Sequence, residues 1–306
     1  MSICLAGTVN AQESQTEYNF LRLPISAHAA ALGGENISLI EDDATLIFHN
    51  PALLSSVSDK TLNLNYMNYM SGVNMMSASF NRVLRERASV ALSAQYIDYG
   101  TMKHTTPGNL HLGEFSAKDL ALAGYFSYML TDRLAGGITA KFITSYIGAY
   151  HSLAMGIDLG LNYYDDSREW SVSVVAKNLG GQLEAYNEAY ERMPLDVQMG
   201  ISKRLTNTPF SISATLVNLN DLHEKFIKHL VFGIDIRLSE QIYVAGGYNF
   251  RLADEMNIVS ADEESNHGAG LSLGAGIRLE RFKLNLAYGK YHVSSRSLVI
   301  NTAYQF

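Results

Sequence analysis

The sequence predicts an all-β protein: a transmembrane antiparallel β-barrel of about 14 strands with a short N-terminal plug that contains a helical turn. Apolar and polar residues alternate one by one over most of the chain from residue 61 onward. Charged residues make up only 17% of the 306 residues, against roughly 25% in soluble domains. No run of about 18 apolar residues is present, which excludes a membrane-spanning helix. A barrel that faces lipid outside and water inside accounts for all three observations.

The alternation is the strongest of these signals. In residues 230–238, every second position is Leu, Phe or Ile, and the positions between them include Gly, Asp and Arg. A period of two places these sets on opposite faces of a strand, as in a barrel with a lipid-facing side and a wet lumen. A soluble strand with one solvated face alternates in the same way. The large number of such segments favours a barrel, because closure removes the exposed edge strands.

Each predicted strand has about the ten residues that a tilted strand needs to cross a bilayer. The strands are predicted at residues 61–70, 73–83, 87–99, 116–130, 134–147, 150–164, 170–179, 194–204, 210–219, 228–239, 241–252, 268–280, 283–292 and 297–306. Short charged turns alternate with longer connections, of which 100–115, 180–193 and 253–267 are the longest. Outer-membrane barrels keep short turns in the periplasm and long loops outside. An even strand number therefore predicts that both termini are periplasmic and that the plug enters from the periplasm.

The N-terminal region divides into two predicted segments before the barrel, which spans 58–306. Residues 1–11, MSICLAGTVNA, resemble the end of a truncated secretory signal peptide whose true start lies upstream. The only cysteine, Cys4, falls within it and lacks the context of a lipoprotein signal, so the mature chain has no disulfide and no thiol catalyst. Residues 12–57 form the N-terminal extension and plug, in which 36–40 is predicted to be a short strand.

The plug motif reads as a set of helix caps. Asp42 or Asp43 is placed to act as the N-cap of a short helix over residues 44–49, which ends at His49. Asn50 precedes Pro51 and therefore disfavours continuation of that helix. Pro51 can begin one more helical turn.

The residues offer little support for an enzyme. Ser272 lies in a G-x-S-x-G match, but within an alternating strand and with only His292 after it. No lysine has a serine three residues before it, and H-E-x-x-H and phosphate-binding glycine motifs are missing from the sequence. We predict no enzymatic activity and no cofactor, and the absence of a basic stripe argues against nucleic acid as a partner. A metal or proton-linked site at His28 and His49 is an alternative to helix capping and hydrogen bonding within the barrel.

Two long connections could bind a partner. Residues 180–193 carry Tyr186, Tyr190 and Arg192, and Tyr and Arg are frequent interface anchors. Residues 100–115 carry Met102 and His104. The alternative interpretation is that both are solvated loops. A pocket between the plug and the barrel wall is the other candidate for a binding site.

Residues 26–59 read SAHAAALGGENISLIEDDATLIFHNPALLSSVSD. This segment resembles the plug motif of outer-membrane barrels related to the long-chain fatty-acid transporter FadL. In Bacteroidetes the motif recurs in barrels of the type IX secretion system. The longer run from Tyr18, together with FSAKDLAL and VAKNLGGQLEAY, is most similar to the PorQ family of that system, and the resemblance extends to Phe306.

The resemblance implies a 14-stranded barrel in the outer membrane of a Gram-negative Bacteroidetes species. It implies a non-enzymatic anchor in the attachment complex, which holds the surface protein PorZ directly and works with the sortase PorU and the barrel PorV. The outer-membrane lipid would be the other partner. The alternative is a FadL-like transporter of hydrophobic small molecules, and residues at the lumen positions suit either function.

Overall fold

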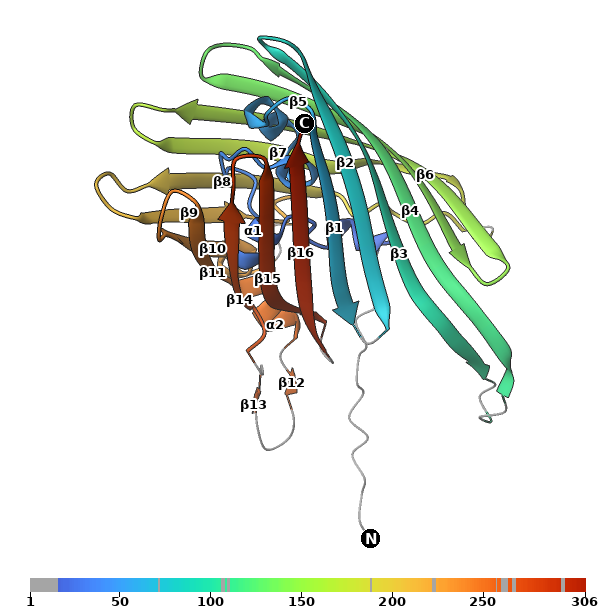
Figure 1. Cartoon of the computed structure of the whole chain (residues 1–306). Helices are drawn as coiled ribbons and strands as arrows, with labels where there is room; N and C mark the ends of the chain where they lie inside the picture. The colour runs from blue at the N-terminus through green and yellow to red at the C-terminus, as the bar shows by residue number, and fades with distance from the viewer. Residues whose placement is uncertain are drawn as a thin grey trace.

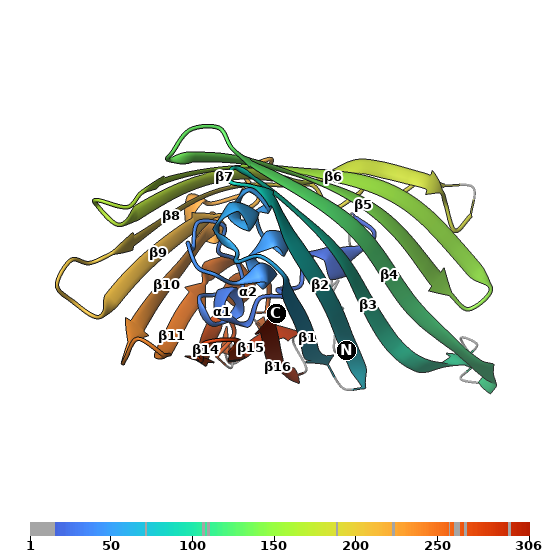
Figure 2. The same cartoon turned by 45° about the horizontal axis from the view of Figure 1, so that its top comes forward.

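The computed structural model describes residues 16–70, 72–105, 108, 111–187, 189–221, 224–256, 258–259, 264–265, 268–292 and 295–306. Its strands form a closed antiparallel barrel of 14 strands around a small N-terminal plug, as predicted (Figures 1 and 2). None of the helices in these ranges has the length and apolar character needed to span a bilayer. The predicted signal peptide at 1–11 lies outside the described residues.

The barrel strands follow one another around the wall in chain order, and β16 closes the barrel against β1. The strands are β1 (Thr61–Met70), β2 (Val73–Arg85), β3 (Ala88–Thr105), β4 (His111–Met129), β5 (Leu134–Ile147), β6 (Tyr150–Asp165), β7 (Trp170–Glu184), β8 (Asp196–Arg204), β9 (Phe210–Leu216), β10 (Leu230–Arg237), β11 (Ile242–Asn249), β14 (Leu271–Arg278), β15 (Phe282–His292) and β16 (Ser295–Gln305). Thr61 lies opposite Gln305 in the closing pair, so the wall begins and finishes at the same end. We call this the turn end, and the opposite end the loop end.

The wall is much taller on one side than on the other. β3 and β4 have 18 and 19 residues, whereas β9, β10 and β11 have 7, 8 and 8. Figure 1 shows β3 and β4 reaching far beyond the short strands at the loop end. The prediction that 100–115 is a loop is therefore wrong over most of its length. Gly100, with a φ of 74°, takes up a bulge between Asp98 and Thr101, and the ladder then continues to Thr105 opposite His111.

The β7–β8 and β11–β14 connections also contain more structure than the sequence indicates. β7 continues to Glu184 past a bulge at Asn178, whose φ is 60°. After β11, the chain forms the short helix α2 (Phe250–Glu255) and the two-residue strands β12 (Ile258–Val259) and β13 (Glu264–Ser265). A further 3-10 turn, η4 (Phe226–His229), precedes β10. Elements of two to six residues give too few positions for a periodicity to show.

The predicted alternation divides the wall into an apolar exterior and a small or polar interior. In β10, Phe232 and Ile234 are exposed, whereas Val231, Gly233 and Asp235 are buried. Each of the 14 barrel strands contributes at least two exposed large hydrophobic side chains. A continuous apolar belt of this kind suits contact with lipid rather than water.

The plug fills the barrel with four short helical pieces. They are η1 (Asn19–Arg22), α1 (Ala27–Ala31), η2 (Ala44–Phe48) and η3 (Pro51–Ser56). The predicted cap is confirmed, because the Asp43 side chain accepts from the Thr45 N–H at the start of η2. The predicted turn from Pro51 is also present as η3, and the Asn50 side chain caps it by accepting from the Ala52 N–H. Both pieces are 3-10 turns, a form that short helical segments commonly take.

One prediction for the plug is wrong, and one element of the plug is not indicated by the sequence. Residues 36–40 form no strand, because the Asn36 side chain accepts from the N–H groups of Ser38 and Leu39 and bends the chain there. The helix α1 was not expected, although Ser26 caps it by accepting from the Ala29 N–H.

The plug also does not enter from the turn end. The Glu17 N–H donates to the Arg192 carbonyl, and the Tyr18 hydroxyl bonds to that of Ser152, so this part of the chain lies at the loop end. At its other extremity, the plug leads into β1 at the turn end. The chain from residue 17 therefore crosses the lumen from one end to the other before the first strand begins.

Candidate functional site

The interior of the barrel is the candidate site, and two parts of the plug occupy it differently. We call residues 18–26 the arm and residues 27–58 the anchored segment. The anchored segment forms ion pairs with the wall strands β7, β10, β14 and β15. The arm forms no ion pair with any part of the chain that the structure describes. It is held instead by apolar packing and by a few hydroxyl and amide contacts.

His28 is the centre of the strongest charged contact in the anchored segment. It is 1% exposed and lies between two carboxylates: Nδ1 is 2.9 Å from Glu41 Oε2, and Nε2 contacts Asp235 of β10. The Tyr243 ring stacks on the imidazole, with 3.9 Å between centroids. Arg278 of β14 lies 3.4 Å from Glu41 and adds a second cation to the group.

The charges in this group stabilise one another. Burial lowers the pKa of His28, but the Glu41 charge and the hydrogen bonds to Asp235 and Glu41 outweigh it and raise that pKa to about 10. Burial likewise raises the pKa of Glu41, but the His28 charge prevails and brings it down to about 2. Over the physiological range, His28 is therefore an imidazolium that donates from both nitrogens.

The same group is not arranged as a metal site, although its ligand atoms lie within 4.8 Å of one another. A metal needs a free imidazole lone pair, and both nitrogens of His28 face carboxylates as donors. His49, the other histidine of the metal hypothesis, contacts Glu35 instead, with 3.3 Å between Nδ1 and Oε2. The structure thus assigns the two histidines to different partners, as the hydrogen-bonding alternative expects.

The acidic triplet at residues 41–43 serves three separate purposes. Asp43 is the helix cap, and its buried carboxylate also accepts from the Thr45 hydroxyl at 2.7 Å. Asp42 pairs with Lys283 of β15 at 2.6 Å and accepts from the Ser58 N–H at 2.7 Å. Glu41 belongs to the His28 group. Sequence reasoning found the cap but missed both wall contacts, and a lysine at a lumen position of β15 was the available signal.

A third ionic contact ties the start of the anchored segment to β7. Glu35 Oε2 lies 3.4 Å from the Lys177 ammonium, in addition to its contact with His49. Burial raises the pKa of Glu35, but the Lys177 charge outweighs this and lowers it to about 2. The carboxylate therefore stays charged and keeps its partners.

The Asn50-Pro51 turn fits against glycines of the wall. A Cβ on Gly160 would lie 2.0 Å from the Asn50 side-chain oxygen, and a Cβ on Gly137 would lie 2.3 Å from the Ala52 nitrogen. The Asn50 amide also donates to the Ile37 carbonyl at 2.9 Å. The plug motif therefore caps a helical turn and also allows the plug backbone to approach the wall closely.

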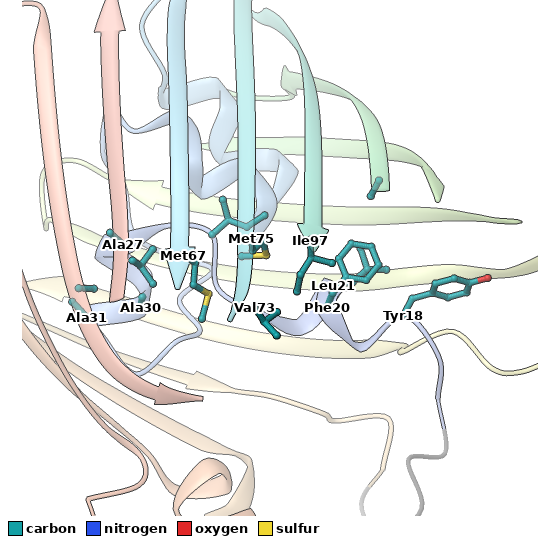
Figure 3. Close-up of a cluster of buried hydrophobic side chains, with 14 of the residues drawn as sticks. Tyr18, Phe20, Leu21, Ala27, Ala30, Ala31, Met67, Val73, Met75 and Ile97 are labelled. Carbon is teal, nitrogen blue, oxygen red and sulfur yellow. The ribbon is translucent and has the colours of Figure 1, made fainter. Parts of the chain in front are cut away.

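The arm lies on a different surface of the lumen, toward the loop end. Phe20 and Leu21 are buried beside Met75 and Ile97 of the wall (Figure 3). The only charged side chain of the arm, Arg22, has a buried Nε without a hydrogen-bond partner among the described residues. Its burial lowers the pKa of the guanidinium. The arm is thus held by apolar packing, while the one charged side chain that it carries has a buried donor without a hydrogen-bond partner among the described residues.

A small cavity lies between the arm and the wall. Its apolar lining comes from Leu21, Leu23, Ile25, Phe48 and Tyr125, and its polar lining includes Gln95, His49, Lys141 and Lys177. Its volume is about 20 Å³, which is room for roughly one water molecule. A second, more polar cavity of about 110 Å³ lies beside residues 38–41 at the turn end.

The predicted partner-binding residues lie on two separate connections. Met102 and His104 lie within β3, on a ribbon whose residues 101–105 are all exposed. Tyr190, which is 67% exposed, and Arg192 lie between β7 and β8. Tyr186 is half-buried and points inward, because its hydroxyl donates to Ser145 of β5. Partner binding by these residues stays a prediction.

The serine of the G-x-S-x-G match has a structural environment. The Ser272 hydroxyl donates to the Ala31 carbonyl at 2.9 Å and accepts from the Gly33 N–H at 2.9 Å. Both partners belong to the plug backbone, so Ser272 helps to hold α1 against β14.

No family model and no curated protein matches this sequence. Solved structures match it in fold. The CymD monoaromatic hydrocarbon channel is 14% identical with a TM-score of 0.63, over 93% of this chain and 98% of CymD. The Pseudomonas putida toluene transporter TodX is 14% identical with a TM-score of 0.58, over 92% of this chain and 96% of TodX. A Pseudomonas aeruginosa FadL homologue is 11% identical with a TM-score of 0.59, over 93% of this chain and 99% of the homologue. At these identities the likeness concerns the fold, and the chain has the plugged 14-stranded barrel fold of FadL-like proteins.

Proposed function

We propose that this protein is a Gram-negative outer-membrane barrel that passes small hydrophobic molecules, with the arm of the plug as its gate. The apolar belt over all 14 strands supports a membrane location. The proteins of similar fold include a toluene transporter and a monoaromatic hydrocarbon channel. The plug fills the lumen with four helical pieces, and the two cavities described above measure about 20 and 110 Å³, so passage of a hydrophobic molecule requires part of the plug to move.

The observation that carries this proposal is the apolar packing of the arm against the wall. Displacing Phe20 and Leu21 into water costs about 1.5–3 kcal/mol for each side chain. A hydrophobic molecule that takes their place recovers this burial, whereas water and polar solutes do not. The arm is therefore a gate that apolar solutes open at lower cost than polar ones. The anchored segment cannot be exchanged in the same way, because its ionic partners in the wall would be left unpaired.

The test is uptake by cells whose own hydrophobic-solute barrels have been deleted. Radiolabelled toluene and a radiolabelled long-chain fatty acid are offered to cells that express the full chain, a variant without residues 18–23, or no barrel. We expect faster uptake with the full chain than with no barrel, and the fastest uptake with the deletion variant. Equal uptake with and without the full chain would contradict the proposal.

A second candidate is an anchor in the type IX secretion system, similar to the PorQ family. The resemblance of residues 18–59 to that family supports it, and so does the projecting β3–β4 ribbon, which is exposed on both faces at residues 101–105. On this proposal, the ribbon and the β7–β8 connection hold PorZ, alongside PorU and PorV, at the surface of a Bacteroidetes outer membrane. The turn end, where Thr61 lies opposite Gln305, would then face the periplasm.

The anchor proposal is tested by crosslinked pull-down from outer membranes, together with a gene deletion assayed for release of secreted cargo. Recovery of PorZ and loss of attached cargo would support it. Failure to recover a large surface protein, with cargo still attached, would exclude it. A variant without residues 101–114 separates the two proposals, because it should lose the surface partner and keep solute uptake.

A further inference from the structure

Two cations lie side by side on the outer face of the barrel near the loop end. Along β15, Leu286 and Tyr288 point outward, and the residues between and after them, Ala287 and Gly289, are buried. By the same alternation, the side chain of Lys290 points outward. Along β16, Leu298 points outward and Ser297 is buried, so Arg296 points outward as well. The register pairs Gly289 with Ser297 and His292 with Ser295, with a bulge on β15 between these pairs. Lys290 lies in this bulge, on the stretch of β15 that faces Arg296 of β16.

The strands that carry this pair, and the two strands that follow them in the wall, contain no carboxylate. Residues 282–306 and 61–85, which form β15, β16, β1 and β2, include neither Asp nor Glu. Neither cation forms an ion pair with a residue that the structure describes. Like charges on adjacent strands repel, so this arrangement destabilises the bare barrel. The repulsion becomes an attraction when an anion lies between them.

The position of the pair points to the kind of anion. The Arg296 guanidinium carbon lies 6.0 Å from the centre of the Tyr288 ring, which is exposed at the rim of the apolar belt. From Arg296, the outward residues of β16 run along the belt to Tyr304. The eight steps from Arg296 to Tyr304 span about 26 Å along the strand, or roughly 20 Å across the membrane once the tilt is allowed for, which is most of the roughly 25 Å apolar band of such barrels. The two cations therefore lie near the edge of the apolar band, from which long Lys and Arg side chains can reach lipid headgroups.

We propose that Lys290 and Arg296 form a binding site for the phosphate of a phosphorylated lipid headgroup in the leaflet at the loop end. The guanidinium offers a planar pair of donors to two phosphate oxygens, and the ammonium supplies a point charge beside it. Tyr288 fixes the guanidinium at the belt rim and contacts the upper part of the acyl chains. This inference rests on the membrane location in the proposed function and adds a lipid class to it.

The structure offers a matched control on another part of the wall. Lys118 of β4 also lies over an exposed tyrosine, 5.5 Å from the ring centre of Tyr146. It is a single cation, and Glu114 lies four residues away on the same strand. A site that needs two adjacent cations and no acid should therefore be absent there.

The test measures lipid binding to the detergent-solubilised full chain by native mass spectrometry. The probes are diphosphoryl lipid A, phosphatidylcholine and inorganic phosphate, and the variants are the double change Lys290→Gln with Arg296→Gln, the single change Arg296→Lys and the control Lys118→Gln. A cation that contacts a bound anionic lipid contributes about one decade or slightly less to its binding, and Lys118 lies outside the proposed site. We expect the double variant to bind lipid A at least tenfold more weakly, Arg296→Lys to lose less, and Lys118→Gln to stay within twofold of the natural chain.

Two results would overturn the inference: equal lipid A binding by the double variant and the natural chain, or binding of inorganic phosphate as tight as that of lipid A. Insertion into phosphatidylcholine vesicles and heat-modifiable gel mobility are measured for all variants. If these are normal while lipid A binding does not depend on the pair, the headgroup site fails and the barrel location stands. If the natural chain does not insert at all, the proposed membrane location fails and the site with it.

Discussion

The arm and the anchored segment belong to one plug, yet they are held by different kinds of interaction. The anchored segment places His28, Glu35, Glu41 and Asp42 against charged partners on four wall strands. The arm buries Phe20 and Leu21 against apolar wall residues. An apolar contact can be replaced by an apolar ligand, whereas a buried charge that loses its partner costs about 3–5 kcal/mol. The difference divides the plug into a fixed part and an exchangeable part.

The largest effect is expected from removing the cation at the centre of the anchored segment. His28→Leu leaves Glu41 and Asp235 buried with one partner fewer, so the free energy of unfolding should fall by about 3–5 kcal/mol. The measurement is urea-induced unfolding in detergent, followed by tryptophan fluorescence of Trp170. Lys118→Gln on the outer surface is the control and should behave like the natural chain. An unchanged midpoint for His28→Leu would mean that the ionic group does not hold the plug.

The next largest effect concerns the arm, and it should appear as local opening rather than global unfolding. Phe20→Ala removes the main buried ring of the arm and weakens its packing by about 3 kcal/mol. The arm has one trypsin site, after Arg22, and no Lys or Arg follows until Lys60. We expect cleavage at Arg22 to become roughly 100-fold faster, since proteolysis follows the population of the open state.

The urea midpoint of the same variant should change much less than that of His28→Leu. If the free energy of global unfolding fell by the same amount, about 3 kcal/mol, the arm and the anchored segment would open together.

A smaller effect is expected where the plug motif approaches the wall. Gly160→Ala places a Cβ 2.0 Å from the Asn50 side chain, which forces the turn away from β6 and should cost about 1–3 kcal/mol. Gly181→Ala is the matched control, because nothing lies within 4 Å of its Cβ position. Both variants are compared by thermal unfolding in detergent, and equal melting temperatures would refute the close approach.

The smallest expected effect is the change in the free energy of unfolding with each unit of pH, which arises from the charged groups of the anchored segment. The folded pKa of His28, about 10, exceeds its ordinary value of 6.5, so its stabilisation is complete below pH 6.5 and is lost as the pH rises through 10. The folded pKa of Glu41, about 2, lies below its ordinary 4.5, so its stabilisation is present above pH 4.5 and is lost as the pH falls through 2.

We therefore expect stability to fall by at most about 1.4 kcal/mol per pH unit between roughly pH 7 and 9. Most of this slope should vanish in His28→Leu, as measured by urea unfolding at each pH. A variant that keeps the slope of the natural chain would assign the pH dependence to other groups.

The barrel was predictable from sequence because its pattern is repeated in every strand. A period of two fixes which face is apolar, as Phe232 and Ile234 show in β10, and the caps at Asp43 and Asn50 follow from local rules of helix termination. The bulges were harder to predict. The sequence predicts a loop from Gly100, whereas the positive φ of this glycine lets β3 continue past it.

The candidate site was less predictable because its contacts join residues far apart in the chain. His28 and Asp235 are 207 residues apart, and Asp42 reaches Lys283 across 241 residues. No local pattern indicates such pairs, and the path of the arm from the loop end is likewise set by tertiary contacts. Assignment to the type IX secretion system rests on the sequence resemblance and stays a prediction.

Hydrogen exchange measured by mass spectrometry tests the division of the plug most directly. The full chain is reconstituted in lipid and exchanged with and without toluene, and peptides from residues 18–26 are compared with peptides from residues 44–56. The account predicts that the arm exchanges at least about 100-fold faster than the anchored segment and faster still with toluene, while the anchored segment keeps its protection. Equal exchange of the two regions, with or without toluene, would contradict it.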